Sequence, residues 1–323
     1  MPTFRAPDGT LLAHRTYGDG PPLVCLPGGP MRASAYLGEL GGLSAHRRLV
    51  MLDLRGTGES AVPEDSGSYR CDRLVGDVEA LREELGVERV DLLAHCAGAN
   101  VAAAYVRAYP ERVGRLALVT PSPIGVGIEV GIEDRLAVAR LREGEPWFGE
   151  AFAALEEVVA GRGAERHWAA VAPFLHGRLD EAARALDAAD AEQRNPEAAA
   201  VFGSEGAFDP EGTRAAFRRF GAPVLVLAGE VDLNSPPGAM GEYAALFPGG
   251  AEFVVQPGAG HHPWLDDGDR FVETVAKFLD RENRERGRSP RKGERPLPLR
   301  SHSGPAQVPV RSSSVPSSPA GSG

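Results

Sequence analysis

Long apolar runs are missing from this 323-residue chain, and cysteine, methionine and tryptophan are scarce. No stretch approaches the roughly 20 apolar residues that cross a bilayer, which argues against membrane insertion. Residues 1–5 lack the apolar core of a secretory signal, so we expect a cytoplasmic protein. The three cysteines lie far apart, which indicates neither a disulfide framework nor a zinc site. We expect no metal and no cofactor, because no ligand cluster or dinucleotide fingerprint is present.

An excess of positive charge is also lacking. Asp and Glu outnumber Lys and Arg by 45 to 35, a net charge of −10, which argues against a nucleic-acid partner. The charge is unevenly spread, since residues 281–323 hold nine basic and three acidic residues and the rest of the chain carries −16. This segment is rich in Arg, Pro and Ser, so we expect a disordered basic tail. An acidic partner for the tail is the alternative.

The most informative segment is residues 90–100, VDLLAHCAGAN. Its apolar start predicts a buried strand and its small residues predict a helix, with a sharp turn between them. Some hydrolases carry their nucleophile in this context, in the pattern G-x-S-x-G. Here the pattern has Ala94 in the first position and Cys96 in the third. A thiolate near a helix N-terminus can be a nucleophile, and a buried structural cysteine is the alternative.

Further motifs follow the ends of other predicted strands. Residues 27–31 (PGGPM) come after an apolar run, and residues 53–60 (DLRGTGES) come after another. The strand that starts at residue 223 ends in an acid, Asp232, and the strand at 253–255 leads to His261. The order nucleophile, acid, base is that of one hydrolase fold and differs from the orders of chymotrypsin and subtilisin. Each residue follows a strand's carboxyl end, where open α/β sheets bind ligands.

Strand and helix patterns alternate along the chain with one interruption. Residues 1–121 contain a hairpin signal at Asp8-Gly9, an amphipathic pattern over 72–85 and a strand over 116–120. Residues 122–219 are rich in Ala and Glu and show only helical spacing, which predicts an inserted cap of four to six helices. Residues 220–280 return to the alternation and end in a helix over 270–279. We therefore expect an α/β fold with a mostly parallel central sheet flanked by helices.

Over roughly residues 1–280 the chain resembles the α/β-hydrolase superfamily, and within it the proline iminopeptidase-like branch. That branch carries H-G-G-P-G, D-x-R-G-x-G-x-S, the nucleophile turn, G-x-x-D and G-x-G-H. The second motif is complete here, and G-x-x-D matches residues 229–232. The first motif departs at Pro27 and Met31, and the nucleophile turn departs at Ala94 and Cys96. These departures concern the reaction more than the fold.

The expected chemistry is acyl transfer to Cys96, with His261 as base and Asp232 orienting the imidazole. Backbone N–H groups of Ala97 and Gly29 are the expected oxyanion donors, because Pro30 has no N–H. A thiol suits esters, thioesters and lactones, as in the similar dienelactone hydrolases, whereas the resemblance implies an N-terminal peptidase. We expect a small acyl substrate, with a short peptide as the alternative. A ligand receptor or lyase on the same fold is a further alternative, and the oligomeric state stays open.

Several neighbouring residues have competing interpretations. His262 could replace His261 as the base, and Glu230 could replace Asp232, although the motif spacing favours neither. We expect His95 to pack or hydrogen-bond beneath the turn, and Asp53 and Arg55 to form a structural ion pair. In the cap, Trp147 and Phe148 are the expected substrate contacts, and core packing is the alternative; other aromatic and acidic cap residues are Trp168, Phe174, Glu143, Glu145, Glu150, Glu156 and Glu157.

Overall fold

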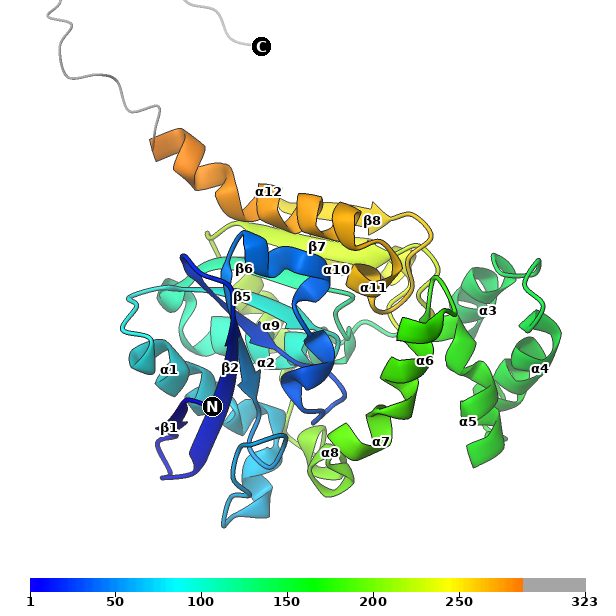
Figure 1. Cartoon of the computed structure of the whole chain (residues 1–323), viewed down its shortest axis with the longest axis horizontal. Coiled ribbons are helices and arrows are strands. Elements are labelled where there is room, and N and C mark those ends of the chain that lie inside the picture. The colour runs from blue at the N-terminus through cyan, green and yellow to red at the C-terminus, as the bar shows by residue number, and fades with distance from the viewer. Residues whose placement is uncertain (287–323) are drawn as a thin grey trace, which may run out of the picture. The chain divides into compact units, whose positions relative to one another are not determined.

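The computed structural model describes the backbone of residues 1–286 and the side chains of residues 1–280. Within this part of the chain, eight strands form one sheet in the order β1-β2-β4-β3-β5-β6-β7-β8 (Figure 1). The two pairs that β2 makes, with β1 and β4, are antiparallel, and the remaining pairs are parallel. The strands are β1 Thr3–Arg5, β2 Leu11–Tyr17, β3 Pro22–Leu26, β4 Arg48–Asp53, β5 Val90–His95, β6 Val113–Val119, β7 Val224–Gly229 and β8 Ala251–Gln256.

Twelve α-helices occur in the described residues, with seven short 3₁₀ turns between them. The helices are α1 Val75–Glu84, α2 Gly98–Ala108, α3 Ile132–Arg140, α4 Phe148–Val159, α5 Glu165–Val171, α6 Glu181–Ala188, α7 Asp190–Gln193, α8 Pro196–Phe202, α9 Pro210–Phe217, α10 Pro237–Ala245, α11 Pro263–Asp266 and α12 Gly268–Arg286. The 3₁₀ turns are η1 Ser34–Leu37, η2 Leu40–Ala45, η3 Ser66–Tyr69, η4 Cys71–Arg73, η5 Pro110–Arg112, η6 Ile124–Val126 and η7 Ala172–Leu175.

Both faces of the sheet are buried, which explains why its central strands read as continuous apolar runs. In β3, for example, Val24 and Leu26 face one core and Leu23 and Cys25 face the other. The first core lies against α1, α2, α9 and α10, and the second lies against α12, α11 and the turns η1 and η2. Figure 1 shows α12 lying along the sheet beside β8. The expected α/β-hydrolase fold is confirmed.

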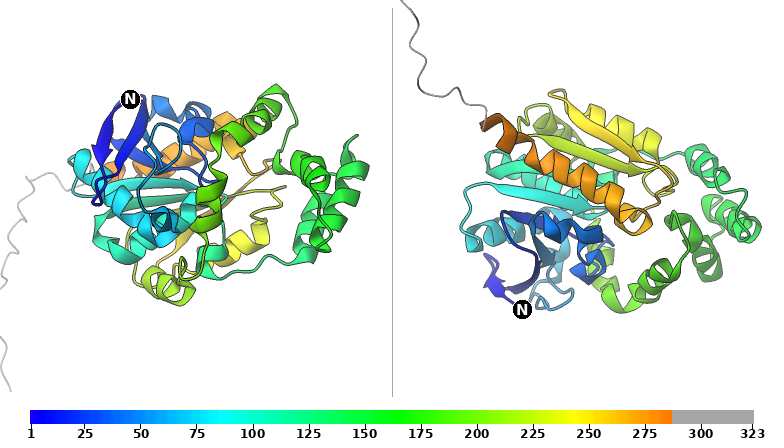
Figure 2. Two further views of the ribbon diagram at one scale, coloured as in Figure 1. Left: turned by 90° about the horizontal axis from the view of Figure 1, so that it is seen from below. Right: turned by 45° about the horizontal axis from the view of Figure 1, so that its top comes forward.

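Residues 122–219, which we propose as the cap, form seven α-helices rather than four to six. One reason is that α7 is a single turn, and another is that α9 packs beneath the sheet, where Phe217 is fully buried. Residues of α3, α4 and η7 instead build a separate small core around Leu155 and Phe174. Figure 2 shows α3, α4 and α5 grouped beyond the end of the sheet, while α6 to α8 return toward the core.

The structure describes a hairpin near the N-terminus and a long helix at the other end of the described residues. The hairpin at Asp8-Gly9 joins β1 to β2, as the turn signal predicts. The last helix continues to Arg286, so it runs past residue 279 and into the segment expected to be a tail. The remainder of that expected tail, residues 287–323, lies outside the described residues. None of the helices in the described part is long and apolar enough to span a membrane.

Candidate active site

The turn between β5 and α2 holds Cys96 in a strained conformation. Its φ is 51°, a left-handed value that few residues other than glycine adopt and that often marks functional sites. The second small residue of the motif, Gly98, is required by close packing, because a Cβ there would lie 2.6 Å from the carbonyl oxygens of Leu26 and Pro27. The strand β3 and the helix α2 thus nearly touch at this point. Cys96 lies deep in the molecule but remains partly accessible.

The glycine-rich loop, residues 27–31, packs directly against this turn. A Cβ on Gly28 would lie 2.7 Å from the Cβ of Cys96. The N–H of Gly28 donates to the Tyr36 hydroxyl at 2.7 Å, so it is already committed. Gly29, the expected oxyanion donor, has a φ of 123°, and its carbonyl accepts from Arg194 Nη1 at 2.5 Å. The cap therefore holds the loop through Arg194.

The acid and base of the motif order meet at the ends of β7 and β8. Asp232 Oδ2 accepts from His261 Nδ1 at 2.8 Å, and Asp232 Oδ1 accepts from the N–H of Asn234 at 2.8 Å. Asp232 is fully buried and His261 is nearly so. The backbone N–H of His261 donates to the carbonyl oxygen of Leu175 in η7 at 2.8 Å, so the cap also holds the loop that carries His261. The buried Nε2 of His261 has no hydrogen-bond partner among the described residues, so it is available to a reacting group.

The electrostatics of Cys96 and His261 favour the charged form of each side chain. Burial raises the pKa of the Cys96 thiol, but the charge of His261 and the Ala97 N–H outweigh burial, so that pKa lies below its usual value. Burial lowers the pKa of His261, but Asp232 and Cys96 raise it well above the ordinary histidine value. This arrangement suits a thiolate beside an imidazolium.

His95 links the glycine-rich loop to the loop of His261 from beneath the turn. Its Nε2 faces the His261 carbonyl oxygen at 2.9 Å, so Nε2 carries the proton, and its Nδ1 accepts from the Tyr36 hydroxyl at 2.6 Å. Burial, together with the charge of His261, holds the pKa of His95 well below its usual value, so the ring is neutral. The sequence-based expectation that His95 hydrogen-bonds beneath the turn agrees with these contacts.

Cys96 lines two cavities, and a third adjoins them through shared residues; we name the three by their lining. The elbow cavity, about 640 Å³, is lined by Cys96, Arg135, Asn234, Ser235 and parts of residues 122–130. The base cavity, about 250 Å³, is lined by Cys96, His261, Gly29 and a set of polar residues that includes Arg32, Asp187, Asp190 and Arg194. The cap cavity, about 720 Å³, is lined by Gly29, Arg135, Asn234 and apolar cap residues that include Leu155, Val158, Val159 and Trp168.

The two cap aromatics expected to contact substrate have other neighbours. The Trp147 ring meets Phe174 edge-on at 5.0 Å, and the Phe148 ring stacks on Phe152 at 5.0 Å. Neither residue lines any of these three cavities. Their contacts favour the core-packing interpretation, and Trp168, which is 60% exposed, is the aromatic ring that lines the cap cavity.

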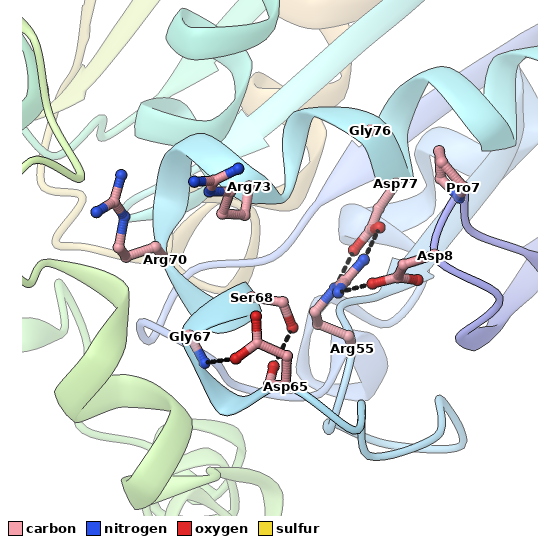
Figure 3. Close-up of a pocket in the computed structure, with 10 residues that line it drawn as sticks. All are labelled: Pro7, Asp8, Arg55, Asp65, Gly67, Ser68, Arg70, Arg73, Gly76 and Asp77. Atoms are coloured by element: carbon pink, nitrogen blue, oxygen red, sulfur yellow. Dashed lines mark hydrogen bonds and ion pairs between the residues drawn. The ribbon is translucent and has the colours of Figure 1, made fainter.

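The expected ion pair between Asp53 and Arg55 is wrong. Asp53 accepts instead from the N–H and hydroxyl of Ser34, at 2.8 and 2.6 Å. Arg55 pairs with buried Asp77 at 2.9 Å and with Asp8 at 2.6 Å. Figure 3 shows Arg55, Asp77 and Asp8 in a further cavity. That cavity has a volume of about 490 Å³, and none of the candidate catalytic residues line it. Its central charges are already paired, so this cavity is a structural feature of the N-terminal hairpin and α1.

The alternative acid and base have different partners. Glu230 is exposed and accepts from the N–H of Gly258 at 2.7 Å, so it does not contact the imidazole of His261. His262 is buried among other rings, with His95 at 5.2 Å and Trp264 at 5.4 Å between centroids. Burial and the neighbouring histidines hold the pKa of His262 well below its usual value. These contacts favour Asp232 and His261 over their neighbours.

Sequence reasoning misses several residues of the site. Tyr36, Arg135 and Arg194 carry no motif, because each reaches the site only through the packing of its helix or turn. Asn234 is the exception. It lies two residues after Asp232, and this closeness in sequence could have identified it as a residue of the site. No group of His, Cys, Asp and Glu side chains within the described residues could hold a metal ion.

A sharp strand–turn–helix at Cys96, a paired Asp232 and His261 after later strands, and a mostly parallel sheet together have the architecture of an α/β hydrolase. The chain belongs to the alpha/beta hydrolase fold family, whose model matches residues 21–268. An uncharacterized protein of Mycobacterium tuberculosis is 28% identical over 291 residues, which cover 86% of this chain and 80% of that protein.

Two further relatives have descriptive names. A proline iminopeptidase of Heyndrickxia coagulans is 24% identical over 278 residues, which cover 81% of this chain and 92% of that protein. Among solved structures, an esterase from Rhodococcus sp. ECU1013 matches with a TM-score of 0.65 and 27% identity, over 86% of this chain and 98% of that one. The chain is thus a hydrolase-family protein with esterase and proline iminopeptidase relatives.

Proposed function

We propose that this protein hydrolyses small acyl substrates, namely esters, thioesters or lactones, through Cys96, His261 and Asp232. The observation that carries the proposal is the buried 2.8 Å contact between Asp232 and His261, beside a cavity that His261 and Cys96 line together. The strained conformation of Cys96 and the lowered pKa of its thiol support the same assignment. We also propose that residues 122–219 act as a cap that selects the substrate.

In the proposed reaction the Cys96 thiolate, whose proton already rests on Nε2 of His261, bonds to the acyl carbon. The leaving group departs with that proton, and the acyl group stays on Cys96 as a thioester. Water then attacks the thioester and gives a proton to His261, and the sulfur departs as the thiolate, which restores the resting pair. Asp232 holds the imidazole in the orientation that leaves Nε2 free, and it stabilises the positive ring.

The N–H groups of Ala97 and Gly29 are the proposed donors to the oxyanion. Ala97 follows the nucleophile directly, and its N–H already interacts with Cys96. Gly29 lines the base cavity together with Cys96, whereas the N–H of neighbouring Gly28 is committed to Tyr36. Each oxyanion donor typically contributes about 3 kcal/mol to the stabilisation of the transition state.

Ester chemistry is favoured over peptide chemistry by the acids of the base cavity. A peptidase acting on N-terminal residues would need a free acid in this cavity to hold the substrate's amine, because Glu129, the acid of the elbow cavity, is exposed to solvent. Asp187 is paired with His176 at 2.9 Å, and Asp190 is paired with Arg32 at 2.9 Å and Arg194 at 2.7 Å. A thiolate also leaves a tetrahedral intermediate more easily than an amine does. Attack of Cys96 on an amide would therefore tend to reverse, whereas an ester has a better leaving group. The Rhodococcus esterase relative is consistent with this choice.

The proposal is tested by intact-mass measurement during incubation with 4-nitrophenyl acetate. We expect a transient acyl adduct on the wild type and none on Cys96→Ala. Cys71→Ala is the matched control, because burial raises the pKa of that thiol and it should not be acylated. An adduct that persists in Cys96→Ala would assign the nucleophile elsewhere. Ester turnover in neither protein would contradict the covalent mechanism and favour the receptor or lyase alternative.

A further inference from the structure

Arg135 occupies an unusual position beside the proposed nucleophile. It extends from α3 of the cap, and it lines both the elbow cavity, which Cys96 also lines, and the cap cavity. It is half-buried, so part of its side chain is available to a molecule within these cavities. We propose that Arg135 forms a subsite for an anionic group, in the first place a carboxylate, on the acyl substrate of Cys96. This inference rests on the proposed function.

The hydrogen bonds of Arg135 leave most of its guanidinium unused. Nη1 donates to the Leu233 carbonyl at 2.6 Å, and this is the one hydrogen bond that the guanidinium makes among the described residues. Arg194, by contrast, uses Nε and Nη2 on Asp190 and Nη1 on Gly29. Arg32 is committed in the same way, to Asp190, to Gln193 and to a carbonyl of α6. Among the arginines that line the three cavities, Arg135 is the one that is held by a hydrogen bond to the protein and still has N–H groups available to a ligand.

The charge of Arg135 is not matched by a direct partner. No ion pair is formed by its guanidinium among the described residues, although burial lowers its pKa. Asp232 raises that pKa from a distance, but its carboxylate is already occupied by His261 and the Asn234 N–H. A partly buried cation with unused donors is costly unless a partner completes it. A carboxylate fits, because two parallel N–H groups can bind its two oxygens.

The surrounding lining indicates what the rest of the ligand is like. Ile128 and Val130 supply apolar surface in the elbow cavity, and the cap cavity is also mainly apolar. Glu129 is the other charged group of the elbow cavity, and it is exposed. The combination fits a short apolar acyl chain that ends in a carboxylate.

Two aryl esters separate the effect of charge from that of shape. Mono-4-nitrophenyl adipate and 4-nitrophenyl hexanoate have acyl chains of equal length and differ at the far end, in a carboxylate or a methyl group. We expect the wild type to prefer the adipate ester in kcat/KM by about 10- to 100-fold, the range of a charge-assisted hydrogen bond. Arg135→Gln should abolish the preference and Arg135→Lys should keep part of it. Arg140→Gln, an exposed arginine of the same helix, is the matched control and should retain it.

Binding of adipate itself gives a readout that does not depend on turnover. We expect adipate to raise the Tm of the wild type and of Cys96→Ala, but not that of Arg135→Gln. If esters are hydrolysed at equal rates and adipate has no effect, the subsite is refuted while the proposed function stands. If neither ester is hydrolysed but adipate still protects through Arg135, the subsite stands and the proposed function fails. Retention of the preference by a folded Arg135→Gln variant would also overturn the inference.

Discussion

Gly28→Ala tests how closely the glycine-rich loop packs against the turn at Cys96. The added Cβ would lie 2.7 Å from the Cβ of Cys96, 3.1 Å from the His95 carbonyl oxygen and 3.3 Å from His95 Nδ1. Carbon atoms in contact prefer a separation of about 3.5–4.0 Å, so the loop and the turn must part by roughly 1 Å. Because Cys96 and His95 both belong to the site, the movement displaces the proposed nucleophile.

The size of the effect follows from this displacement. Overpacking of this kind costs about 1–3 kcal/mol of folding free energy, which lowers Tm by roughly 2–10 °C in a domain of this size. A misplacement of about 1 Å in a reacting group costs about 100-fold in rate. We therefore expect kcat for 4-nitrophenyl acetate to fall about 100-fold, with a smaller change in KM.

The assay combines steady-state kinetics with thermal unfolding. Gly149→Ala is the matched control, since nothing lies within 4 Å of its added Cβ and the residue is in α4. That variant should keep its activity and gain up to about 1 kcal/mol of stability, because alanine favours the helix. A Gly28→Ala protein with the activity and Tm of the control would refute the close contact and its proposed role.

Three further predictions concern neighbouring contacts. His261→Gln removes the charge that lowers the pKa of the Cys96 thiol, so burial dominates, the pKa rises and alkylation by iodoacetamide at pH 7 falls by about 10-fold or more; an unchanged pH profile would contradict the pairing. Arg194→Ala frees the Gly29 carbonyl, which Arg194 holds in the glycine-rich loop, so kcat should fall about 10-fold with little change in KM. A higher KM with an unchanged kcat would argue against a positioning role. Arg55→Met leaves Asp77 as an unpaired buried charge and should destabilise the protein by about 3–5 kcal/mol at pH 7. Burial raises the pKa of Asp77, so this loss should shrink as the pH falls and the carboxyl is protonated; thermal unfolding across pH measures it, and adding Asp77→Asn should restore stability.

Much of the fold could be predicted because local patterns carry it. Apolar runs mark the parallel strands, and each of the motifs follows the carboxyl end of one of them. Parallel strands bring those ends to one edge of the sheet. This is why residues as distant as Asp232 and His261 could be expected to meet. The turn at Cys96 could be expected for a similar local reason, since only small neighbours allow β3 and α2 to approach so closely.

Other contacts could not be predicted because they depend on directions that sequence spacing does not specify. Asp53 and Arg55 are two residues apart, yet their side chains reach different partners, Ser34 and Asp77. In the cap, helical spacing identifies Trp147 as apolar surface but does not say which core it joins. The structure packs it against Phe174, so its ring lies away from the cavities at Cys96.

The sequence by itself determined the order of the strands along the chain, the sharp turn at Cys96 and the positions of Asp232 and His261 after later strands, because each depends on a few adjacent residues. Only the tertiary structure decided which groups of the cap face the site. Arg135 and Arg194 lie on the cap, and whether each guanidinium is committed or open depends on how whole helices pack against the sheet. Such packing is the sum of many weak contacts between distant residues, and no local pattern encodes it.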